Sequence, residues 1–598
     1  MAKRNVPINY TSRDFNSIKD DLVNYAKRYY PETFKDFSEA SFGSLLLDSV
    51  AYVGDIMSFY LDYQVNESYL DTAVEYDNII RLANQMGYKY QGSASTTGVV
   101  TFYAIVPANT VGLGPDTRYM PIMKRNSMVG ATNGSSYILI DDIRFDKASN
   151  TVVAARMNST TGNPSHYAIK TEGQVISGEF GTTTVTVGAF ERFRNITLAK
   201  RNLVEIVSVF DSDGHEYFEV EYLSHDVVYK GVPNKDENTK DNAPSLLRPF
   251  VAARRFVTKK SPSGVVLQFG YGSDSEIASP TLAEPSGVVL QRHAKDYITD
   301  TAFDPSDLLG TDKLGIGPAN TTLTITYRLN VRSSTNAAVG SLKNVLRPII
   351  EFNDPAIAIT ESAKAVVSSI ECYNEEPIVG SVTLPTVEEI RRRAYDIFPT
   401  QNRAVTSSDY EAIAYMMPDS YGAIKRCRMV RDQDSLKRNL NMYVLAEDSN
   451  QKLIQANQAL KDNLKIWLNK YRMVNDTVDI LDGKVINIGI EFEVVSNTEV
   501  NRYEVLDSAI SMLREKISRP MFMGERFYIT DIYTELNKVR GVADTVNVKV
   551  VNKSGGPYSQ SAFNVNQYMS LDGRYIAVPD NVVLEVKYPK IDIKGTVK

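Results

Sequence analysis

The chain has 598 residues, of which 43% are hydrophobic and 23% charged, and this balance excludes a disordered or fibrous protein. At about 150 residues per domain, the length predicts three or four structural units. The formal net charge of −6 provides no basic field to draw the molecule onto nucleic acid or an anionic membrane, so we expect neither as a partner.

The first residues contain no recognisable export signal. The opening MAKRNVPINYTSRDF lacks an apolar core of signal-peptide length, and uncharged apolar runs stay far below the roughly 18 residues of a membrane span. We therefore expect a soluble protein without a membrane-spanning segment.

Three helices are predicted in the first 92 residues. Thr11 to Asp14 has capping-box spacing, and apolar residues then recur at steps of three and four until Pro31 ends the helix. A second helix is predicted from about Ser41 to Asn66. A third, from about Thr72 to Met86, ends at Gly87, which suits a left-handed helix cap.

The second helix has more apolar surface than its neighbours can cover. One stripe consists of Leu46, Val50, Val53, Met57 and Tyr60, and the other of Leu45, Tyr52, Ile56, Phe59 and Tyr63. A helix that is apolar on two faces needs cover from two sides, and only two shorter helices are at hand. We therefore predict a bundle with another chain, with candidate contact residues Phe15, Ile18, Leu22, Leu46, Val50, Val53, Met57 and Tyr60.

From about Thr96 to Gly340 the hydrophobic period changes to two. Runs such as TTGVVTFYAIV, LVEIVSVF and TLTITYRLNV are separated by Gly, Asn, Asp and Pro clusters, which predicts an antiparallel β domain. Asp211-Ser212-Asp213-Gly214 lacks the third acidic position and the terminal Glu of a calcium loop, so we interpret it as a hairpin turn. Gly231 to Ser245 has few apolar side chains and is predicted to be a mobile surface insertion.

Helices and strands alternate in the C-terminal half. A helix capped by Ser408 and Glu411 precedes strands in YGAIKRCRMV and LNMYVLAE, and a long helix is predicted with one face formed by Leu453, Leu460, Leu464, Trp467 and Tyr471. A second unit combines the alternating strand Ile486 to Val494, two further helices and the strand ADTVNVKVV. Two small α+β units are therefore expected.

These patterns together predict a multidomain α+β protein. The expected divisions are an N-terminal helical region that joins an interchain bundle (1–92), a central antiparallel β domain (93–340), a connecting segment (341–385), two C-terminal α+β domains (386–480 and 481–556) and a tail (557–598).

No motif in the sequence predicts catalysis or metal binding. The four histidines, His166, His215, His225 and His293, show no ligand spacing, and Cys372 and Cys427 are too few for a disulfide framework or a four-cysteine zinc site. The G-x-G pairs at Gly270 and Gly315 are explained as turns. We expect no enzyme activity, no cofactor, no metal and no small-molecule substrate.

Two basic clusters are better explained as protein surface than as nucleic-acid sites. Neither has the interleaved aromatic residues and basic surroundings that a nucleic-acid site requires, whereas arginine suits the polar rim of a protein contact. The candidate rim residues are Arg391, Arg392 and Arg393 on a helix, and Lys425, Arg426 and Arg428 on a strand.

Three separated patterns support a family resemblance when taken in order. They are FSEASFGSLLLDSVAYVGDIMSFYLDYQVNESYLDTA with ANQMGYK, then VLQFGYGS with NTTLTITYR, and finally IRRRAYDIFPTQNRAVTSSDYEAIA with the later GVADTVNVKV. In this order they resemble the baseplate J-like family of contractile phage tails, particularly the larger wedge proteins of T-even-like phages. The resemblance spans about residues 10 to 555 and departs from small family members in the long central β domain and in the 231–245 insertion.

The resemblance implies a structural baseplate wedge subunit. In such tails, copies of the wedge protein join another wedge protein through an N-terminal helical bundle, and their C-terminal domains link neighbouring wedges into a ring around the tail tube that widens as the sheath contracts. The implied partners are a second copy of the chain, other wedge proteins, and sheath-initiating and tube-proximal baseplate proteins, in a virion tail baseplate assembled in the host cytoplasm.

The alternative is a tail-associated carbohydrate-binding or glycan-hydrolysing protein. A long β domain and many carboxylates motivate it. Internal β-helix repeats or an acid pair on adjacent turns would favour it, and neither is visible in the sequence.

Overall fold

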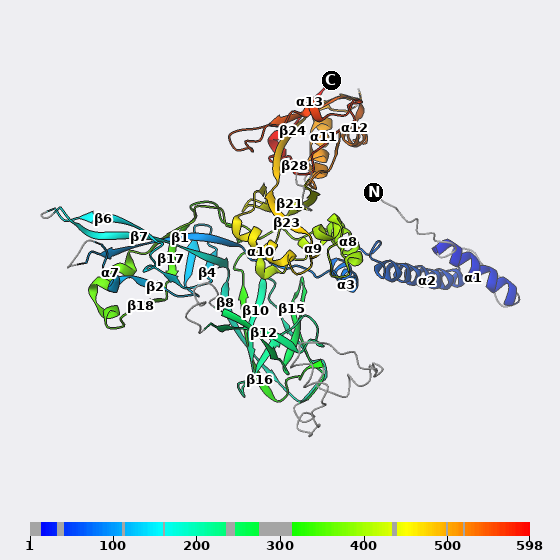
Figure 1. The fold of residues 1–598 in the computed structure, drawn as a ribbon. Coiled ribbons are helices and arrows are strands. Elements are labelled where there is room, and N and C mark those ends of the chain that lie inside the picture. The colour runs from blue at the N-terminus through cyan, green and yellow to red at the C-terminus, as the bar shows by residue number, and fades with distance from the viewer. Residues whose placement is uncertain are drawn as a thin grey trace. The chain divides into compact units, whose positions relative to one another are not determined.

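The computed structural model describes residues 14–30, 32, 41–109, 114–159, 162–234, 245–273, 314–432, 439–497, 500–517 and 521–598. The chain forms two compact units, one made of Met1–Lys89 with Pro385–Phe398 and the other of Tyr90–Leu384 with Pro399–Lys598. The helices, the antiparallel and mixed sheets and the small C-terminal α+β parts confirm the predicted multidomain α+β class (Figure 1).

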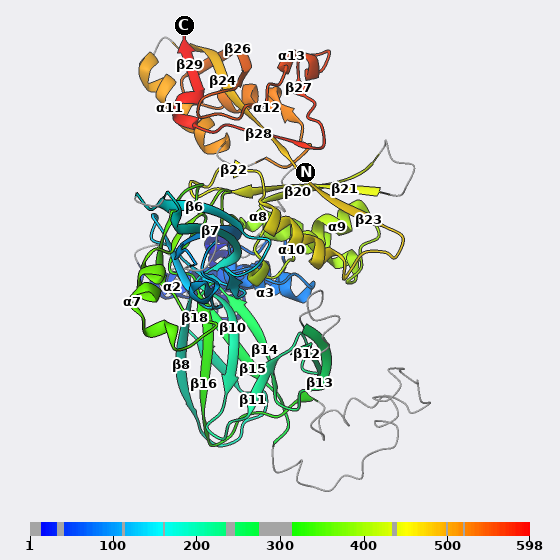
Figure 2. The same cartoon turned by 60° about the vertical axis from the view of Figure 1, so that its left-hand side comes forward.

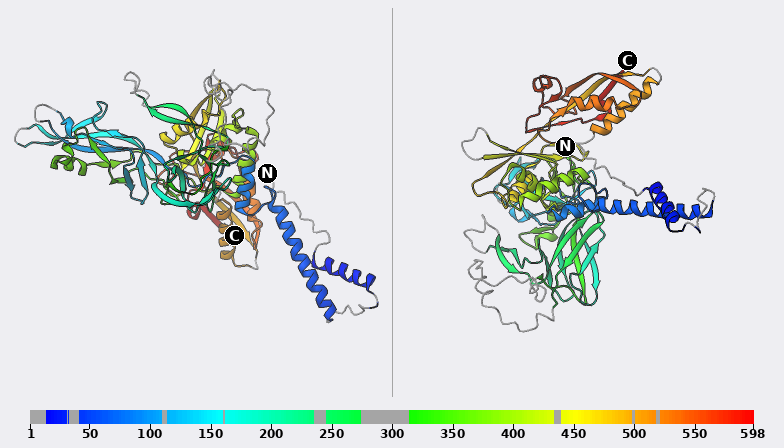
Figure 3. Two further views of the ribbon diagram at one scale, coloured as in Figure 1. Left: turned by 90° about the horizontal axis from the view of Figure 1, so that it is seen from below. Right: turned by 90° about the vertical axis from the view of Figure 1, so that its right-hand side faces the viewer.

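The first unit is helical. It contains α1 (Phe15–Tyr29), α2 (Phe42–Glu67), α3 (Tyr76–Gln85) and α8 (Val387–Ile397). Figures 1 and 3 show α1 lying alongside α2.

The three predicted N-terminal helices are present, with two corrections at their starts. Asp14 rather than Thr11 is the N-cap residue of α1, and Thr11 to Arg13 lie outside the described residues. The third helix begins at Tyr76 and not at Thr72, because residues 68–75 form a turn that is bonded to Glu67. Gly87 follows that helix with φ +94°, as the cap prediction requires.

Most of the second unit's N-terminal half is β structure. Its elements are β1 (Thr97–Pro107), η1 (Thr117–Tyr119), β2 (Pro121–Met123), β3 (Met128–Ala131), β4 (Ser136–Leu139), β5 (Ile143–Arg144), β6 (Thr151–Met157), β7 (Pro164–Ser177), β8 (Glu179–Val187), β9 (Asn195–Leu198), β10 (Leu203–Phe210), β11 (Glu216–Glu219), β12 (Val227–Pro233), β13 (Ser245–Val251), β14 (Arg255–Ser261), β15 (Gly264–Phe269), β16 (Thr321–Leu329), β17 (Leu342–Arg347), β18 (Ile350–Phe352), η3 (Ile357–Ile359), α7 (Glu361–Ser368) and β19 (Glu371–Tyr373).

Two seven-stranded sheets organise this half. The first has the order β17-β3-β4-β7-β1-β19, with β6 paired to β7, and the second has the order β8-β16-β10-β11-β14-β15-β9. The pairs are antiparallel as predicted, except that β11 and β14 run parallel. Because β17 and β19 belong to the first sheet, residues 341–385 are part of this β structure, and the prediction of a separate connecting segment is wrong.

Several smaller sequence predictions fall in this region. Asp211 to His215 is the predicted hairpin turn between β10 and β11, closed by the Asp211 N–H donating to the His215 carbonyl at 3.0 Å. The two G-x-G pairs face each other, with the Gly272 N–H donating to the Gly315 carbonyl at 2.9 Å, so they form a strand-like contact instead of two separate turns. Of the 231–245 insertion, residues 235–244 lie outside the described residues.

The C-terminal part of the second unit forms two mixed sheets with helices. Its elements are η4 (Phe398–Thr400, whose first residue belongs to the helical unit), α9 (Ser407–Ala414), η5 (Asp419–Tyr421), β20 (Arg426–Arg431), β21 (Asn439–Glu447), β22 (Leu453–Ile454), α10 (Gln458–Leu468), β23 (Thr477–Asp482), β24 (Lys484–Ser496), α11 (Arg502–Ile517), β25 (Phe527–Tyr528), α12 (Ile529–Leu536), β26 (Val542–Lys553), α13 (Val565–Tyr568), β27 (Tyr575–Ile576), β28 (Val582–Glu585), α14 (Pro589–Asp592) and β29 (Ile593–Val597).

Two predicted helix starts are displaced in this part. Thr406 and Asp409, and not Ser408 and Glu411, form the capping box of α9. The long helix predicted from Leu453 begins only at Gln458, with Asn457 as N-cap, because Leu453 lies in β22. Apolar spacing continued across the strand and the cap, so periodicity alone could not separate them.

The predicted tail is part of the last sheet. β28 and β29 both pair in parallel with β24, whose other edge is covered by β26. Ile593 and Leu584 are buried in the same cluster as Ile490 on β24. The separation of 557–598 from 481–556 is therefore wrong, since the strand β24 needs partners that only the tail supplies.

Candidate protein interface on the N-terminal helices

Side chains on α2 follow a seven-residue repeat. Residues seven apart on an α-helix lie almost in line along its surface, because 3.6 residues make one turn. Three lines differ sharply in character: a small one (Ser44, Ala51, Ser58), an acidic one (Asp48, Asp55, Asp62) and an apolar one (Leu46, Val53, Tyr60).

Helix α1 packs on the small line. Ser44, Ala51 and Ser58 are buried, and a Cβ at Gly54 would lie 3.2 Å from Cδ1 of Ile18. Lys19 Nζ lies 2.7 Å from Asp48 Oδ1, at the margin of the same contact. Because small residues let the two backbones approach closely, the apolar side chains of α1 pack on a face of α2 that has few large side chains.

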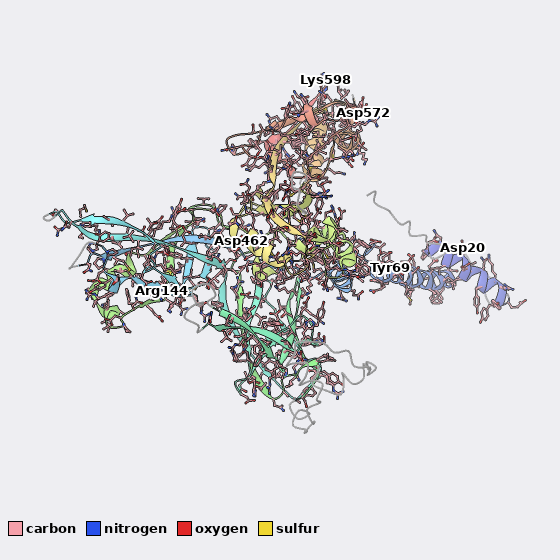
Figure 4. The ribbon with its side chains drawn as sticks, in the orientation of Figure 1. Asp20, Tyr69, Arg144, Asp462, Asp572 and Lys598 are labelled. Atoms are coloured by element: carbon pink, nitrogen blue, oxygen red, sulfur yellow. The ribbon has the colours of Figure 1, made fainter. Side chains whose placement is uncertain are left out.

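Both predicted apolar stripes of α2 therefore lie mostly on the side that α1 does not cover, here called the open side. All five residues of the first stripe are more than half exposed, from 52% at Leu46 to 60% at Met57 and Tyr60. In the second stripe Ile56 and Tyr63 are half-buried, whereas Leu45, Tyr52 and Phe59 are exposed. Figure 4 shows side chains standing out along the arm that runs from α1, with Asp20, to Tyr69 just beyond α2.

The predicted contact residues of α1 are placed differently. Phe15, Ile18 and Leu22 are half-buried, and Ile18 contacts α2 of the same chain. Sequence reasoning missed the small line that receives this helix. The signal for it was present, since Ser44, Ala51 and Ser58 recur every seven residues in an otherwise large apolar helix.

A buried carboxylate, Glu67, stabilises the turn at residues 68–75 between α2 and α3, here called the elbow. Glu67 accepts hydrogen bonds from the Val74 N–H at 2.7 Å, from the Glu75 N–H at 3.3 Å and from Asn78 Nδ2 at 2.9 Å. Burial acts to raise the pKa of Glu67, but these hydrogen bonds and the nearby Arg391 outweigh it, so the pKa lies below the usual range of glutamate. The ionised carboxylate thus organises the turn at the base of α2.

Helix α8 also makes hydrogen bonds to this elbow. Arg391 donates from Nε to the Leu70 carbonyl at 2.8 Å and also bonds the Ala73 carbonyl. Tyr395 donates to Asp71 Oδ1 at 2.7 Å, and this bond raises the pKa of Tyr395. Arg391 is therefore committed to its own chain, whereas Arg392 is exposed and lies 3.6 Å from Asp396.

The second predicted basic cluster is mostly interior. Lys425 Nζ lies 3.2 Å from Glu447 Oε2, and both side chains are buried. Arg426 is 1% exposed and donates to the Met521 carbonyl at 2.9 Å, with its guanidinium 4.6 Å from the ring centre of Phe522. Burial removes Lys425 and Arg426 from the surface, so they cannot belong to the contact rim that was predicted on this strand. Arg428, at 41% exposure, remains accessible.

Among the described residues, α2 has the length and composition of a membrane span. Its best window has a mean hydropathy of 1.2, and 17% of that window is buried. The prediction that uncharged apolar runs stay far below about 18 residues still holds, because Asp48, Asp55 and Asp62 interrupt them, but the average hydropathy of the helix nevertheless reaches that of a span. Length and composition alone do not decide what covers the helix.

The described residues outside the helical unit contain two features that bear on chemistry. Asp211, Asp213 and His215 form a group close enough to share a cation, but Asp211 Oδ1 already accepts the Asp213 and His215 N–H groups of the hairpin turn. The central sheets, antiparallel except for the β11–β14 pair, are not the stacked coils of a β-helix (Figure 2), so the β structure does not favour the hydrolase alternative.

A cleft of about 540 Å³ in the second unit is lined by two carboxylates. Glu585 accepts from the Leu453 N–H at 3.3 Å and from Asn487 Nδ2 at 3.0 Å, and burial raises its pKa. Asp448 accepts the Asn450 and Lys452 N–H groups. Both groups thus serve contacts within the chain.

Comparisons with known proteins support a baseplate relationship for the helical arm. Residues 14–85 match the family model described as bacteriophage baseplate protein, N-terminal domain, which covers α1, α2 and α3. No curated protein matches the chain. The baseplate part of the sequence resemblance is therefore confirmed for this region, whereas membership of the J-like family stays a prediction.

Two solved structures are similar to the chain in part. A chain of the anti-feeding prophage (AFP) baseplate, from a cryo-EM structure with 6-fold symmetry imposed, is 9% identical, with a TM-score of 0.25 and coverage of 96% of this chain and 98% of that one. A chain of the type VI secretion system TssK-TssF-TssG baseplate subcomplex is 10% identical, with a TM-score of 0.25 and coverage of 73% and 95%. These TM-scores are too low to establish a common fold.

Proposed function

We propose that the chain is a structural, non-enzymatic subunit of a contractile-injection baseplate, and that its α1–α2 arm binds helices of partner baseplate proteins. The observation that carries the proposal is the open apolar face of α2, within the region that matches the baseplate family model. Large exposed apolar patches on soluble proteins mark interaction sites, because water is a poor environment for them.

The finer role follows the sequence resemblance. Copies of the chain join another wedge protein through the helical arm, and their C-terminal halves link wedges into a ring whose rearrangement accompanies sheath contraction. Sheath-initiating and tube-proximal proteins are further partners. The exposed Arg392 and the accessible Arg428 are the members of the predicted rim that suit a contact between copies.

A membrane is the other environment that would cover α2. The acidic line argues against it, since each aspartate near the centre of a spanning helix costs about 2.5–3.5 kcal/mol on insertion scales. Asp48 is also paired with Lys19 from α1, so the helix is built to carry charge along one line. Partner helices can leave that line in water while they cover the apolar lines.

The experiment is co-purification of the full chain with the other tail proteins of its source. Val50→Asp and Met57→Asp should each lower recovery of the complex at least tenfold, because each places a charge in an apolar contact. Both positions are exposed in the free chain, so folding should be unchanged. Leu571→Asp, at an apolar position outside the arm that is more exposed than either, is the control.

Two results would contradict the proposal. One is normal recovery of complexes by both α2 variants. The other is binding of the wild-type chain to phospholipid vesicles that Val50→Asp abolishes, which would assign the face to a membrane instead.

A further inference from the structure

A pocket lies between the start of α1 and the middle of α2. Its volume is about 530 Å³, and its lining includes Asp14, the N-cap residue of α1, with Asp55, Ser58 and Phe59 of α2. Ser58 is 8% exposed, and its Oγ has no hydrogen-bond partner within the described residues. Burying a hydroxyl without a partner costs free energy, so a further polar group is expected in this pocket.

The pocket opens onto the acidic line of α2. This helix contains three aspartates and Glu67 but no Lys or Arg, so it has no cation of its own. Asp48 is paired with Lys19 of α1, whereas Asp55 forms no ion pair within the part of the chain that the structure describes. Glu67 is already bonded within the elbow. An occupant with basic side chains therefore fits beside Asp55.

Exposed apolar side chains flank the acidic line beyond the pocket. Residues three and four apart are neighbours on a helix surface, so Phe59 lies beside Asp55 and Val65 beside Asp62. Phe59 is 56% exposed and Val65 is 55% exposed. Val65 also continues the small line after Ser58, at the point where α1 no longer covers it. This part of α2, here called the 55–65 strip, thus suits a segment that combines basic and apolar residues.

We propose that residues 1–13 of the same chain, which lie outside the described residues, bind the 55–65 strip as an extended segment. The segment, MAKRNVPINYTSR, leads directly into Asp14, and Asp14 lines the pocket at which the strip begins. It contains Lys3, Arg4 and Arg13 and no acidic residue, so its charge is opposite to that of the strip.

The sequence of the segment favours extended backbone. Pro7 cannot donate within a helix, and it restricts the residue before it to extended conformations. Val6, Ile8 and Tyr10 alternate with Pro7 and Asn9, which places the three larger side chains on one face of an extended chain. That face can cover Phe59 and Val65.

The reach of the segment places Tyr10 near Val65. From Ser58 to Val65 the helix rises by about 10 Å, which about three or four extended residues span. Counting back from Asp14, this distance ends at Tyr10. The covalent link holds the segment at an effective concentration on the order of millimolar, so a small contact suffices for it, whereas a separate chain would need a larger one.

Disulfide trapping in the purified full chain tests the position of the segment. The native Cys372 and Cys427 are buried, so they do not interfere. Tyr10→Cys with Val65→Cys should form at least five times more intrachain disulfide under mild oxidation than Tyr10→Cys with Gln64→Cys. Gln64 is the matched control, because it is exposed and adjacent to Val65 but lies about 100° farther from the acidic line around the helix.

A charge swap tests the ionic part of the contact. Asp55→Lys and Arg13→Glu should each lower the yield of the Tyr10–Val65 disulfide at least threefold, and the double variant should recover most of it. An acid beside a helix N-terminus suits the helix dipole, so Arg13→Glu should leave α1 intact. Unchanged hydrogen exchange over residues 15–29 in both single variants verifies that α1 remains packed on α2.

Three results would overturn the proposal. Equal yields with Val65→Cys and Gln64→Cys would leave the strip to a partner chain, and a disulfide found only between two chains would assign it to a second copy. Single charge variants that keep the full yield, or a double variant that recovers none of it, would remove the pairing of Arg13 with Asp55. Because the purified chain is measured alone, these outcomes do not depend on the baseplate role.

Discussion

At the residue scale, the elbow between α2 and α3 depends on the ionised carboxylate of Glu67. It accepts two backbone N–H groups and one side-chain amide, which leaves the α2–α3 turn with its donors satisfied. Its lowered pKa means that this stabilisation is complete above the ordinary glutamate pKa and is lost as pH falls through the folded-state pKa.

We expect Glu67→Gln to loosen this elbow. The amide cannot accept at both ends, so the Val74 and Glu75 N–H groups should exchange with solvent about tenfold faster at pH 7, which corresponds to about 1.4 kcal/mol. Hydrogen exchange measured by mass spectrometry over residues 68–79 checks this. Asp77→Asn, in the first turn of α3, removes the same charge and should have little effect. Exchange over residues 68–79 that is the same in Glu67→Gln and wild type at pH 7 would contradict the assignment.

A second residue-scale prediction concerns the buried pair of Lys425 and Glu447. Glu447 Oε2 also accepts from Thr383, so the pair is embedded in a bonded site. Lys425→Met should destabilise the surrounding strands by about 3–5 kcal/mol, because it leaves a buried charge without its counter-charge. The double variant with Glu447→Gln should recover most of that loss. Urea titration followed by hydrogen exchange of β20 and β21 measures both, and a double variant as unstable as Lys425→Met would refute the pairing argument.

At the element scale, hydrophobic spacing predicted most helices and strands but not what each face meets. The two stripes of α2 and the alternation of β24 were visible in the sequence. The face of α2 on which α1 packs was not visible in the sequence, because hydrophobic spacing identifies large apolar residues whereas this contact uses Ser44, Ala51 and Ser58. Arg426 was misplaced for a related reason: a charge on a strand suggests exposure, and only the fold brings the Met521 carbonyl to it.

The packing of α1 on the small line can be tested by enlarging Ala51. Ala51→Leu introduces a large side chain where Ala51 is fully buried between two close helices, and such overpacking costs about 1–3 kcal/mol. The α1 segment should separate from α2, and hydrogen exchange over residues 15–29 should become at least fivefold faster. Val50→Leu, on the open side, is the control and should leave exchange in α1 unchanged. Slow exchange of α1 in Ala51→Leu would show that the helix is held by other contacts.

At the scale of the whole molecule, the domain boundaries were the feature hardest to predict from the sequence. Helix α8 looked like the start of a C-terminal domain, yet it belongs to the helical unit, where Arg391 and Tyr395 bond the turn between α2 and α3. The tail after 557 had weak periodicity because its strands are short, and parallel pairing with β24 leaves no local signal in the sequence. Contacts between distant segments decide both cases.

The last prediction concerns the C-terminal sheet. We expect residues 484–598 to fold independently, because they contain all four strands of the β24 sheet and the whole of the buried cluster around Ile490. A fragment ending at 556 loses Val565, Ile576, Val582, Leu584, Val586 and Ile593 from the buried cluster. At about 1.5–3 kcal/mol for each large side chain, this loss is comparable to the whole stability of a domain.

Thermal unfolding followed by circular dichroism decides between the two fragments. Residues 484–598 should melt in one cooperative transition, whereas 484–556 should show none, because β24 would keep β26 on one edge and expose the other. Restoring the tail as a separate peptide, 557–598, should rescue the transition if the parallel strands are what is missing. A cooperative transition in 484–556 alone would mean that β24, β26, α11 and α12 suffice as a core and that β28 and β29 are additions to it.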